Sequence, residues 1–311
     1  MDIASQTLAP GEAEWRPSEP ARRGAWFPDE AVAAVQRHPR FPEALRHAAS
    51  SGVNLYIGNR FLNLMVNDRG RFFITLLAVH LSRVSCDNDP VPGLTVNRMK
   101  RICVEHEICS RGRAEAMIML MRLYGFLAPA GSAASGSRRF LLPTDRLLTL
   151  HRERISGMLG AVAMVLPDVQ AALTRVNDAE YVKAHVSHVC RQFLDGFSFI
   201  DQVPDVRMFF ERNAGFVTQM RMQLTADGAD TFPPAGIVTG SQSALAREFG
   251  VSRIHVRRLL NDAVREGFLE RVGAESFRVL PRMRQLTRDW WAAYFLLVAA
   301  AARAALAEIA P

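Results

Sequence analysis

Residues 241–280 constrain the fold of this chain more than any other stretch, because they contain two helix starts, a sharp turn and a hairpin. They read SQSALAREFGVSRIHVRRLLNDAVREGFLERVGAESFRVL. Ser241 and Ser252 can each cap a helix by accepting a free backbone N–H. Gly250, which lies between them, can adopt the left-handed conformation that ends a helix. Because apolar side chains also recur at helical spacing in both segments, the stretch predicts a helix-turn-helix.

The second of these helices has basic and polar residues on its outer face, and its packing against the first helix does not require them. Arg can bond guanine edges bidentately in the major groove, and Asn can do the same for adenine. A β-hairpin is predicted next, with strands that start at Phe268 and Phe277, and its arginines are expected to contact phosphate. The predicted DNA contacts are Ser252, Arg253, Ile254, Arg257, Arg258, Asn261, Arg271 and Arg278.

This stretch resembles the winged helix-turn-helix of bacterial transcription regulators of the MarR and GntR type. The residues that carry the resemblance are Leu245-Ala246, Gly250-Val251-Ser252, Val256, Leu259 and Gly267-Phe268-Leu269. The resemblance covers about 40 residues and implies that the second helix enters the major groove of double-stranded DNA.

An earlier stretch repeats this layout. With a shift of 142 residues, Ser110-Arg111 falls on Ser252-Arg253, and the Gly-Phe-Leu of 125–127 falls on that of 267–269. A shift of 143 aligns the preceding helices, and a shift of 137 or 138 aligns the segments after the hairpins. The predicted fold is therefore mainly α with small β-hairpin wings. Two duplicated winged helix-turn-helix units, each of domain size, are joined and flanked by helices.

By the shift of 142, the first unit differs at its turn and on its outer face. Its counterparts of Ala246, Gly250, Arg257 and Arg258 are Val104, Ile108, Glu115 and Ala116. A carboxylate repels phosphate, so we expect this unit to contact DNA mostly through its wing, or else to be a packing or dimerisation module. Its predicted contacts are Ser110, Arg111, Arg113, Arg138 and Arg139. If both units bind one duplex, two unlike faces about 34 Å apart predict an asymmetric site.

The chain divides into five predicted parts. These are a partly disordered N-terminal segment (1–50), the first unit (51–157), a helical connector (158–196), the second unit (197–285) and a C-terminal helix (286–311). Apolar side chains nearly encircle the last helix, so it must be buried between the two units or against a second chain. A homodimer is predicted through Trp290, Trp291, Tyr294, Phe295, Leu297 and Val298.

Charge and composition favour a polyanionic partner in the cytoplasm. The net charge is +7, and 94–155 and 239–290 are its basic segments, with 11 and 10 Lys and Arg against 5 and 6 Asp and Glu. The four cysteines have no framework spacing, and no secretion signal is visible. The longest charge-free apolar run has 13 residues, fewer than the roughly 18 of a membrane span. We therefore expect a nucleoid-associated protein and no membrane association.

No motif in the sequence indicates catalysis. Cys103, His106 and Cys109 form C-x-x-H-x-x-C, but a structural zinc site needs four ligands, and no second cluster lies nearby. The glycine-rich phosphate-binding motifs G-x-x-x-x-G-K-[ST] and G-x-G-x-x-G do not occur in the sequence. The chain is predicted to be no enzyme and to bind no metal or cofactor. A small-molecule effector remains open, because apolar pockets between helices are common ligand sites.

Three functions are compatible with these features. The leading one is a transcriptional regulator that binds a specific double-stranded DNA site. Plasmid-type replication initiators also carry two winged helices, of which the first serves dimerisation and the second binds repeats at the origin. The third is a protein-interaction scaffold that uses winged helices without DNA, and it predicts no salt-dependent affinity for a duplex.

Overall fold

A computed structural model describes residues 26–57, 62–63, 69–83, 93–130, 140–226 and 231–310. The protein is mainly helical, with one antiparallel sheet of two strands and one of three. The predicted disorder of the N-terminal segment concerns residues 1–25, which lie outside the described residues, as do Arg138 and Arg139.

The first half of the chain contains helices and a two-stranded sheet. Its elements are α1 (Asp29–Arg37), α2 (Phe41–Tyr56), α4 (Arg69–Arg83), α5 (Val96–Glu105), α6 (Arg111–Leu123), β1 (Leu127–Pro129), β2 (Leu141–Pro143) and α7 (Asp145–Val162). Strands β1 and β2 are antiparallel, and Leu94 adds an isolated bridge to Leu141.

The second half repeats this order after a helical connection. The connection comprises a short 3-10 turn (Pro167–Val169), α8 (Gln170–Leu173), α9 (Ala179–Leu194), α10 (Phe199–Gln202), a second 3-10 turn (Pro204–Val206) and α11 (Arg207–Phe210). Then follow α12 (Gly215–Gln223), β3 (Ile237–Thr239), α13 (Gln242–Phe249), α14 (Arg253–Arg265), β4 (Leu269–Arg271), β5 (Ser276–Val279) and α15 (Pro281–Glu308). The sheet order is β3-β5-β4, and both pairs are antiparallel.

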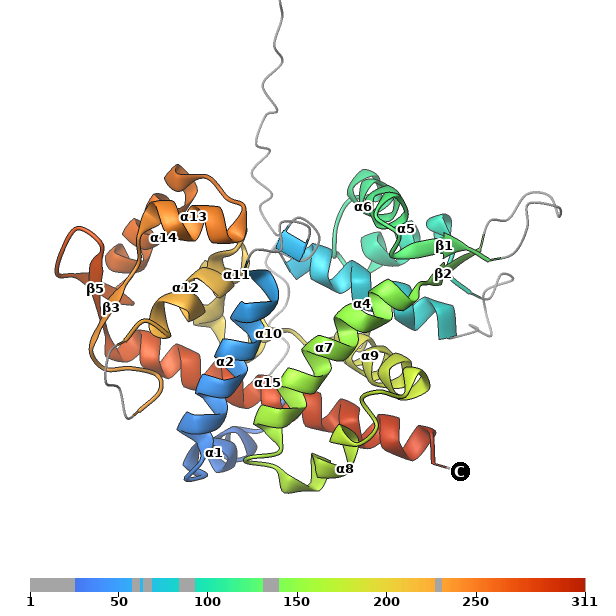
Figure 1. The fold of residues 1–311 in the computed structure, drawn as a ribbon, viewed down its shortest axis with the longest axis horizontal. Coiled ribbons are helices and arrows are strands. Elements are labelled where there is room, and N and C mark those ends of the chain that lie inside the picture. Colours follow the sequence, from blue (N-terminus) through green and yellow to red (C-terminus); the bar gives the residue numbers. More distant parts are fainter. Residues whose placement is uncertain are drawn as a thin grey trace, which may run out of the picture.

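Residues 69–162 and 215–308 therefore share one sequence of elements: helix, extended bridge or strand, two helices, two strands and a long helix. Figure 1 places α13 and α14 at the upper left and α5 and α6 at the upper right, while α15 runs below both. In the structure, the first unit is residues 69–162 and the second unit is residues 215–308, in place of the predicted ranges 51–157 and 197–285.

The hairpins of the two units are built from matching contacts. Gly125 and Gly267 have φ of 72° and 73°, and each precedes a buried phenylalanine. In the first unit the guanidinium of Arg146 lies 5.1 Å from the Phe126 ring, and in the second Arg282 lies 4.4 Å from the ring of Phe268. Each arginine also donates to a backbone carbonyl two residues before that phenylalanine.

Strand pairing corrects the shift that the sequence suggested after the hairpins. Leu127 faces Pro143, and Leu269 faces Val279. Pro143 therefore corresponds to Val279, at a shift of 136 and not of 137 or 138.

The turns also correct the predicted alignment of the first unit. The Val251 N–H donates to Ala246 O, and the Ile108 N–H donates in the same way to Cys103 O. The counterpart of Ala246 is therefore the buried Cys103, and Val104 is 43% exposed. The left-handed residue of the first unit is Glu107, with φ of 51°, where the second unit has Gly250 with φ of 65°.

The central packing of the molecule joins α2 to α7. Gly157 and Gly160 both lie inside α7. A Cβ at Gly157 would come within 2.9 Å of Ser51 Cβ, and one at Gly160 within 3.3 Å of His47 Nε2. The glycines therefore permit a close crossing of two helices. The predicted boundaries at 50 and 157 fall within α2 and α7.

Helix α15 is buried within the single chain. It packs on α1, α7, α9 and α10, and the boundary predicted at 285 falls inside it. All six side chains predicted to dimerise (Trp290, Trp291, Tyr294, Phe295, Leu297 and Val298) are at most 9% exposed. A second chain cannot reach them, so the assignment of a dimer interface to these residues is corrected. Among the described helices α15 has the length and hydropathy of a membrane span, but 67% of its most apolar window is buried in the protein.

Candidate nucleic-acid interface

The two helices α13 and α14 are joined by a short, well-defined turn. Ser252 Oγ accepts a hydrogen bond from the His255 N–H at 3.1 Å and caps α14. Ser241 occupies the cap position of α13, but its side chain makes no cap hydrogen bond, so that prediction is wrong. Buried apolar residues from both helices (Leu245, Ala246, Phe249, Val256, Leu259) fix their inner sides. This packing determines which side of α14 faces outward.

The outer face of α14 carries Arg253, Ile254, Arg257, Arg258 and Asn261, and all five residues are exposed. Ile254 is 53% exposed. Within the described part of the chain, no ion pair or side-chain hydrogen bond involves the guanidinium of Arg253, Arg257 or Arg258. The prediction placed these residues together on one open face, and the structure does so.

The carboxylate of α14 does not cancel this charge. One carboxylate oxygen of Asp262 lies 2.5 Å from a guanidinium nitrogen of Arg212, and the other lies 2.7 Å from a guanidinium nitrogen of Arg265. Although burial raises the pKa of Asp262, its hydrogen bond to Arg212 and the charges of both arginines hold the pKa below its usual value. Asp262 is thus ionised and neutralised by its neighbours, and the outer face of α14 stays positive. The sequence analysis missed Arg212, whose only signal was its charge.

The hairpin of β4 and β5 in the second unit is less open than predicted. Arg271 donates to Asn261 Oδ1 at 2.9 Å and lies 4.7 Å from the Phe277 ring. Arg278 pairs with Glu270, which faces it across β4 and β5. Both arginines are exposed, but contact with phosphate would require that these pairs loosen. The unpaired positive charge is concentrated on α14.

The outer surface of the first unit differs in charge. Ser110 caps α6 by accepting from the Arg113 N–H at 3.3 Å, and Arg111 and Arg113 are exposed. Glu115 forms an ion pair with Lys100 of α5, a partner that the sequence analysis did not identify. This pair removes the predicted repulsion between Glu115 and phosphate, but it leaves the middle of the outer face without free positive charge.

The cysteine and histidine residues of the first turn do not form a metal site in the described residues, where no group of three potential ligands comes together. Cys103 is buried, and a hydrogen bond with Cys109 together with burial raises the pKa of its thiol. His106 is exposed on the turn. Cys103 therefore packs in the core of the first unit, whereas His106 lies at the surface.

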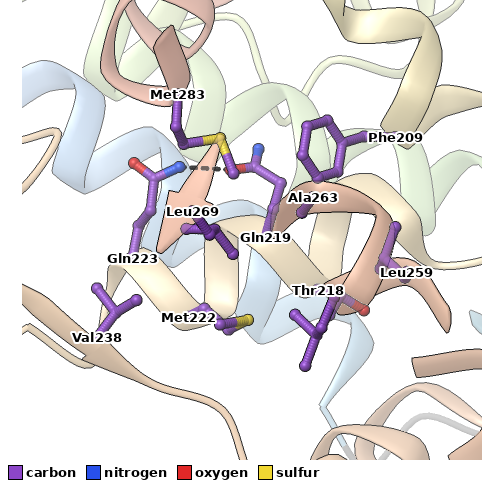
Figure 2. Close-up of a pocket in the computed structure, with 11 residues that line it drawn as sticks. Phe209, Thr218, Gln219, Met222, Gln223, Val238, Leu259, Ala263, Leu269 and Met283 are labelled. Atoms are coloured by element: carbon purple, nitrogen blue, oxygen red, sulfur yellow. Dashed lines mark hydrogen bonds between the residues drawn. The ribbon is translucent and has the colours of Figure 1, made fainter. Parts of the chain in front are cut away.

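Figure 2 shows the residues that line a cavity, which come from α11, α12, α14 and α15 and from strands β3 and β4. Its volume is about 10 Å³, close to the space that one water molecule needs and far below a ligand pocket. Buried Gln223 donates to Gln219 and, at 2.9 Å, to Thr287 Oγ1. This cavity is therefore part of a packed core and does not accommodate a small-molecule effector.

No protein-family model matches the chain, and no curated protein or solved structure matches it significantly. Its function is inferred from the geometry of its own residues.

Proposed function

We propose that this protein binds specific sites in double-stranded DNA as a transcriptional regulator, and that its two units are winged helix-turn-helix domains that arose by duplication. The matching hairpin contacts of Arg146 on Phe126 and Arg282 on Phe268 support a common origin. The second unit is the DNA-reading one, with α14 in the major groove.

The observation that carries this proposal is the charge on the outer face of α14. Three guanidiniums that have no partner among the described residues lie on one side of a helix whose carboxylate is neutralised by Arg212 and Arg265. The fold gains little from exposed arginines, because water solvates them and surface ion pairs stabilise a protein only weakly. A cluster of them on one helix face is the usual footprint of a DNA-binding protein. The width of the major groove fits one helix.

Selection from a library of random duplexes, followed by fluorescence anisotropy at several salt concentrations, tests the proposal. We expect one enriched motif, and an affinity that falls steeply with salt at a slope of about 0.9 per phosphate contact. Arg257→Glu combined with Arg258→Glu should abolish preference for the motif while circular dichroism stays unchanged. A scaffold would show no salt-dependent affinity, and repeated motifs beside the gene would favour a replication initiator.

A matched control separates the helix face from the loss of net charge. Arg37→Glu with Arg191→Glu changes the net charge by the same amount, at exposed positions on α1 and α9. This control should retain the motif preference. Equal losses in both double variants would mean that binding depends on overall charge, and the assignment of α14 as the reading helix would then be wrong.

A further inference from the structure

One stripe on the outer face of α6 is apolar, in contrast to the corresponding positions of α14. Gly112, Ala116, Met119 and Leu123 follow one another at spacings of four, three and four residues, which places them on one stripe of the helix. Met119 is 64% exposed and Leu123 is 77% exposed. The opposite side of α6 is already buried in the first unit. A helix that is apolar on both sides is expected to be covered on both.

The corresponding stripe of the second unit shows that the fold does not require apolar residues there. A shift of 142 takes the four positions to Ile254, Arg258, Asn261 and Arg265, three of which are polar. The two units have the same elements and matching hairpin contacts, so inward packing does not explain the difference. The stripe on α6 is therefore a surface for another molecule.

We propose that this stripe packs against the same stripe of a second copy of the chain, with the two α6 helices antiparallel about a two-fold axis. The small residues Gly112 and Ala116 lie towards the start of α6, and the large Met119 and Leu123 lie towards its end. Antiparallel packing places Leu123 of one copy over Gly112 of the other, and Met119 over Ala116. A Cβ at Gly112 would meet no described atom within 4 Å apart from its chain neighbours and the backbone of its own helix, which leaves this space open to the second copy. A parallel arrangement would oppose large to large and leave a gap between the small residues.

The charges beside the stripe favour the same arrangement. Glu115 and Arg122 lie on one edge of it, seven residues apart. Glu115 pairs with Lys100 of its own chain through Oε2, and its side chain is still 48% exposed. In the antiparallel pair, the other carboxylate oxygen of each Glu115 can accept from Arg122 of the second copy, which gives two attractive contacts related by the two-fold axis. A surface that complements itself in both shape and charge identifies a second copy as the occupant, and not an unrelated protein.

The size of the surface sets the expected strength of the dimer. Helix α6 has 13 residues, and one pair of such helices buries less than the roughly 1,200 Å² of a standard stable interface. The dimer should therefore depend on concentration, with a dissociation constant in the micromolar range. This association does not involve α14 and does not rest on DNA binding.

Sedimentation velocity of the full chain without DNA, over a range that reaches about 100 μM, measures the association directly. Wild-type protein should shift from monomer to dimer as concentration rises. Met119→Glu with Leu123→Glu should remain monomeric at every concentration with an unchanged circular dichroism spectrum. The control Ile237→Glu alters an exposed apolar side chain of β3 and should dimerise as the wild type does.

A charge exchange tests the antiparallel arrangement. Arg122→Glu alone and Glu115→Arg alone each place like charges across the two-fold axis and should weaken the dimer at least tenfold, whereas the double variant should restore it. A wild-type protein that is monomeric at all concentrations overturns the proposal. So does a dimer that survives the two glutamates on the stripe, because another surface must then hold it. A charge exchange without restoration overturns the antiparallel geometry.

Discussion

Three buried histidines predict that mild acid destabilises the fold. His80, His151 and His185 are at most 8% exposed and lie where α4, α7 and α9 meet. Burial lowers the pKa of His151 and His185 to about 3, with a further contribution from the charge of Arg154. Burial and nearby positive groups lower the pKa of His80 to about 4. In the unfolded chain each pKa is about 6.5, so the unfolded state binds more protons below that pH.

The sign and size of the effect follow from this difference. Above about pH 6.5 the three histidines hardly lower the free energy of unfolding. They lower it progressively as the pH falls towards their pKa values in the folded state. At about pH 5, protonation of each histidine stabilises the unfolded state by about 2 kcal/mol. The three together therefore lower the free energy of unfolding by about 6 kcal/mol. A typical domain has a net stability of roughly 5–15 kcal/mol. Between about pH 6 and pH 5 the free energy of unfolding should therefore fall by about 4 kcal/mol.

Urea unfolding followed by circular dichroism at several pH values between about pH 8 and pH 5 measures this slope. His151→Leu is the informative variant, because neither ring nitrogen of His151 makes a hydrogen bond and leucine leaves no polar partner orphaned. It should remove about a third of the slope. His106→Gln, at an exposed position, should leave the slope as it is. A free energy of unfolding that is constant over this range, or equal slopes for wild type and His151→Leu, would refute the reasoning.

Two glycine positions and one glutamate give further predictions. Gly157→Val should lower the free energy of unfolding by about 1–3 kcal/mol, because its Cβ would meet Ser51 at 2.9 Å. The control Gly52→Ala should not lower it, because its Cβ makes only an ordinary contact at 4.0 Å. Similar melting temperatures for both variants would contradict the close crossing of α2 and α7. Glu107→Gly should stabilise the protein, and Gly250→Ala should destabilise it, each by about 1 kcal/mol, since both residues have positive φ. Thermal unfolding of the two variants checks the opposite signs, and a change of the same sign in both would show that φ does not control these turns.

The second unit could be predicted from sequence because single residues have local roles there. Ser252 caps a helix, and Gly250 and Gly267 take positive φ, so each fixes a boundary without reference to the rest of the chain. The outer side of α14 followed from the helical period once its inner side was known. The exposure of Arg257 and Arg258 was predicted in the same way, and the structure places both as expected.

Features that depend on distant contacts could not be predicted in this way. Gly157 looks the same in sequence whether it loosens a helix or admits a neighbour, and only the position of α2 decides. The turn of the first unit has Glu107 in a conformation that glycine would favour, so a comparison based on glycine was misplaced by one residue. The burial of α15 depends on α9 and α1, which lie far away in the chain. By contrast, the spacing of Met119 and Leu123 was a local signal that a count along the outer face would have found.

The two proposals together bear on the symmetry of the DNA site. The two units have similar residues at inward positions because the fold needs them, whereas residues at outward positions are free to diverge. In the two proposals, α14 therefore binds DNA and its counterpart α6 binds a second copy of the chain. Figure 1 shows α6 and α13–α14 on the same side of the molecule. If α6 joins two chains about a two-fold axis, the two copies of α14 are related by that axis, and the bound sequence should be an inverted repeat. If both units of one chain bind DNA instead, the unlike faces of α6 and α14 require an asymmetric sequence. The motif obtained from duplex selection therefore distinguishes an associating first unit from a DNA-binding one.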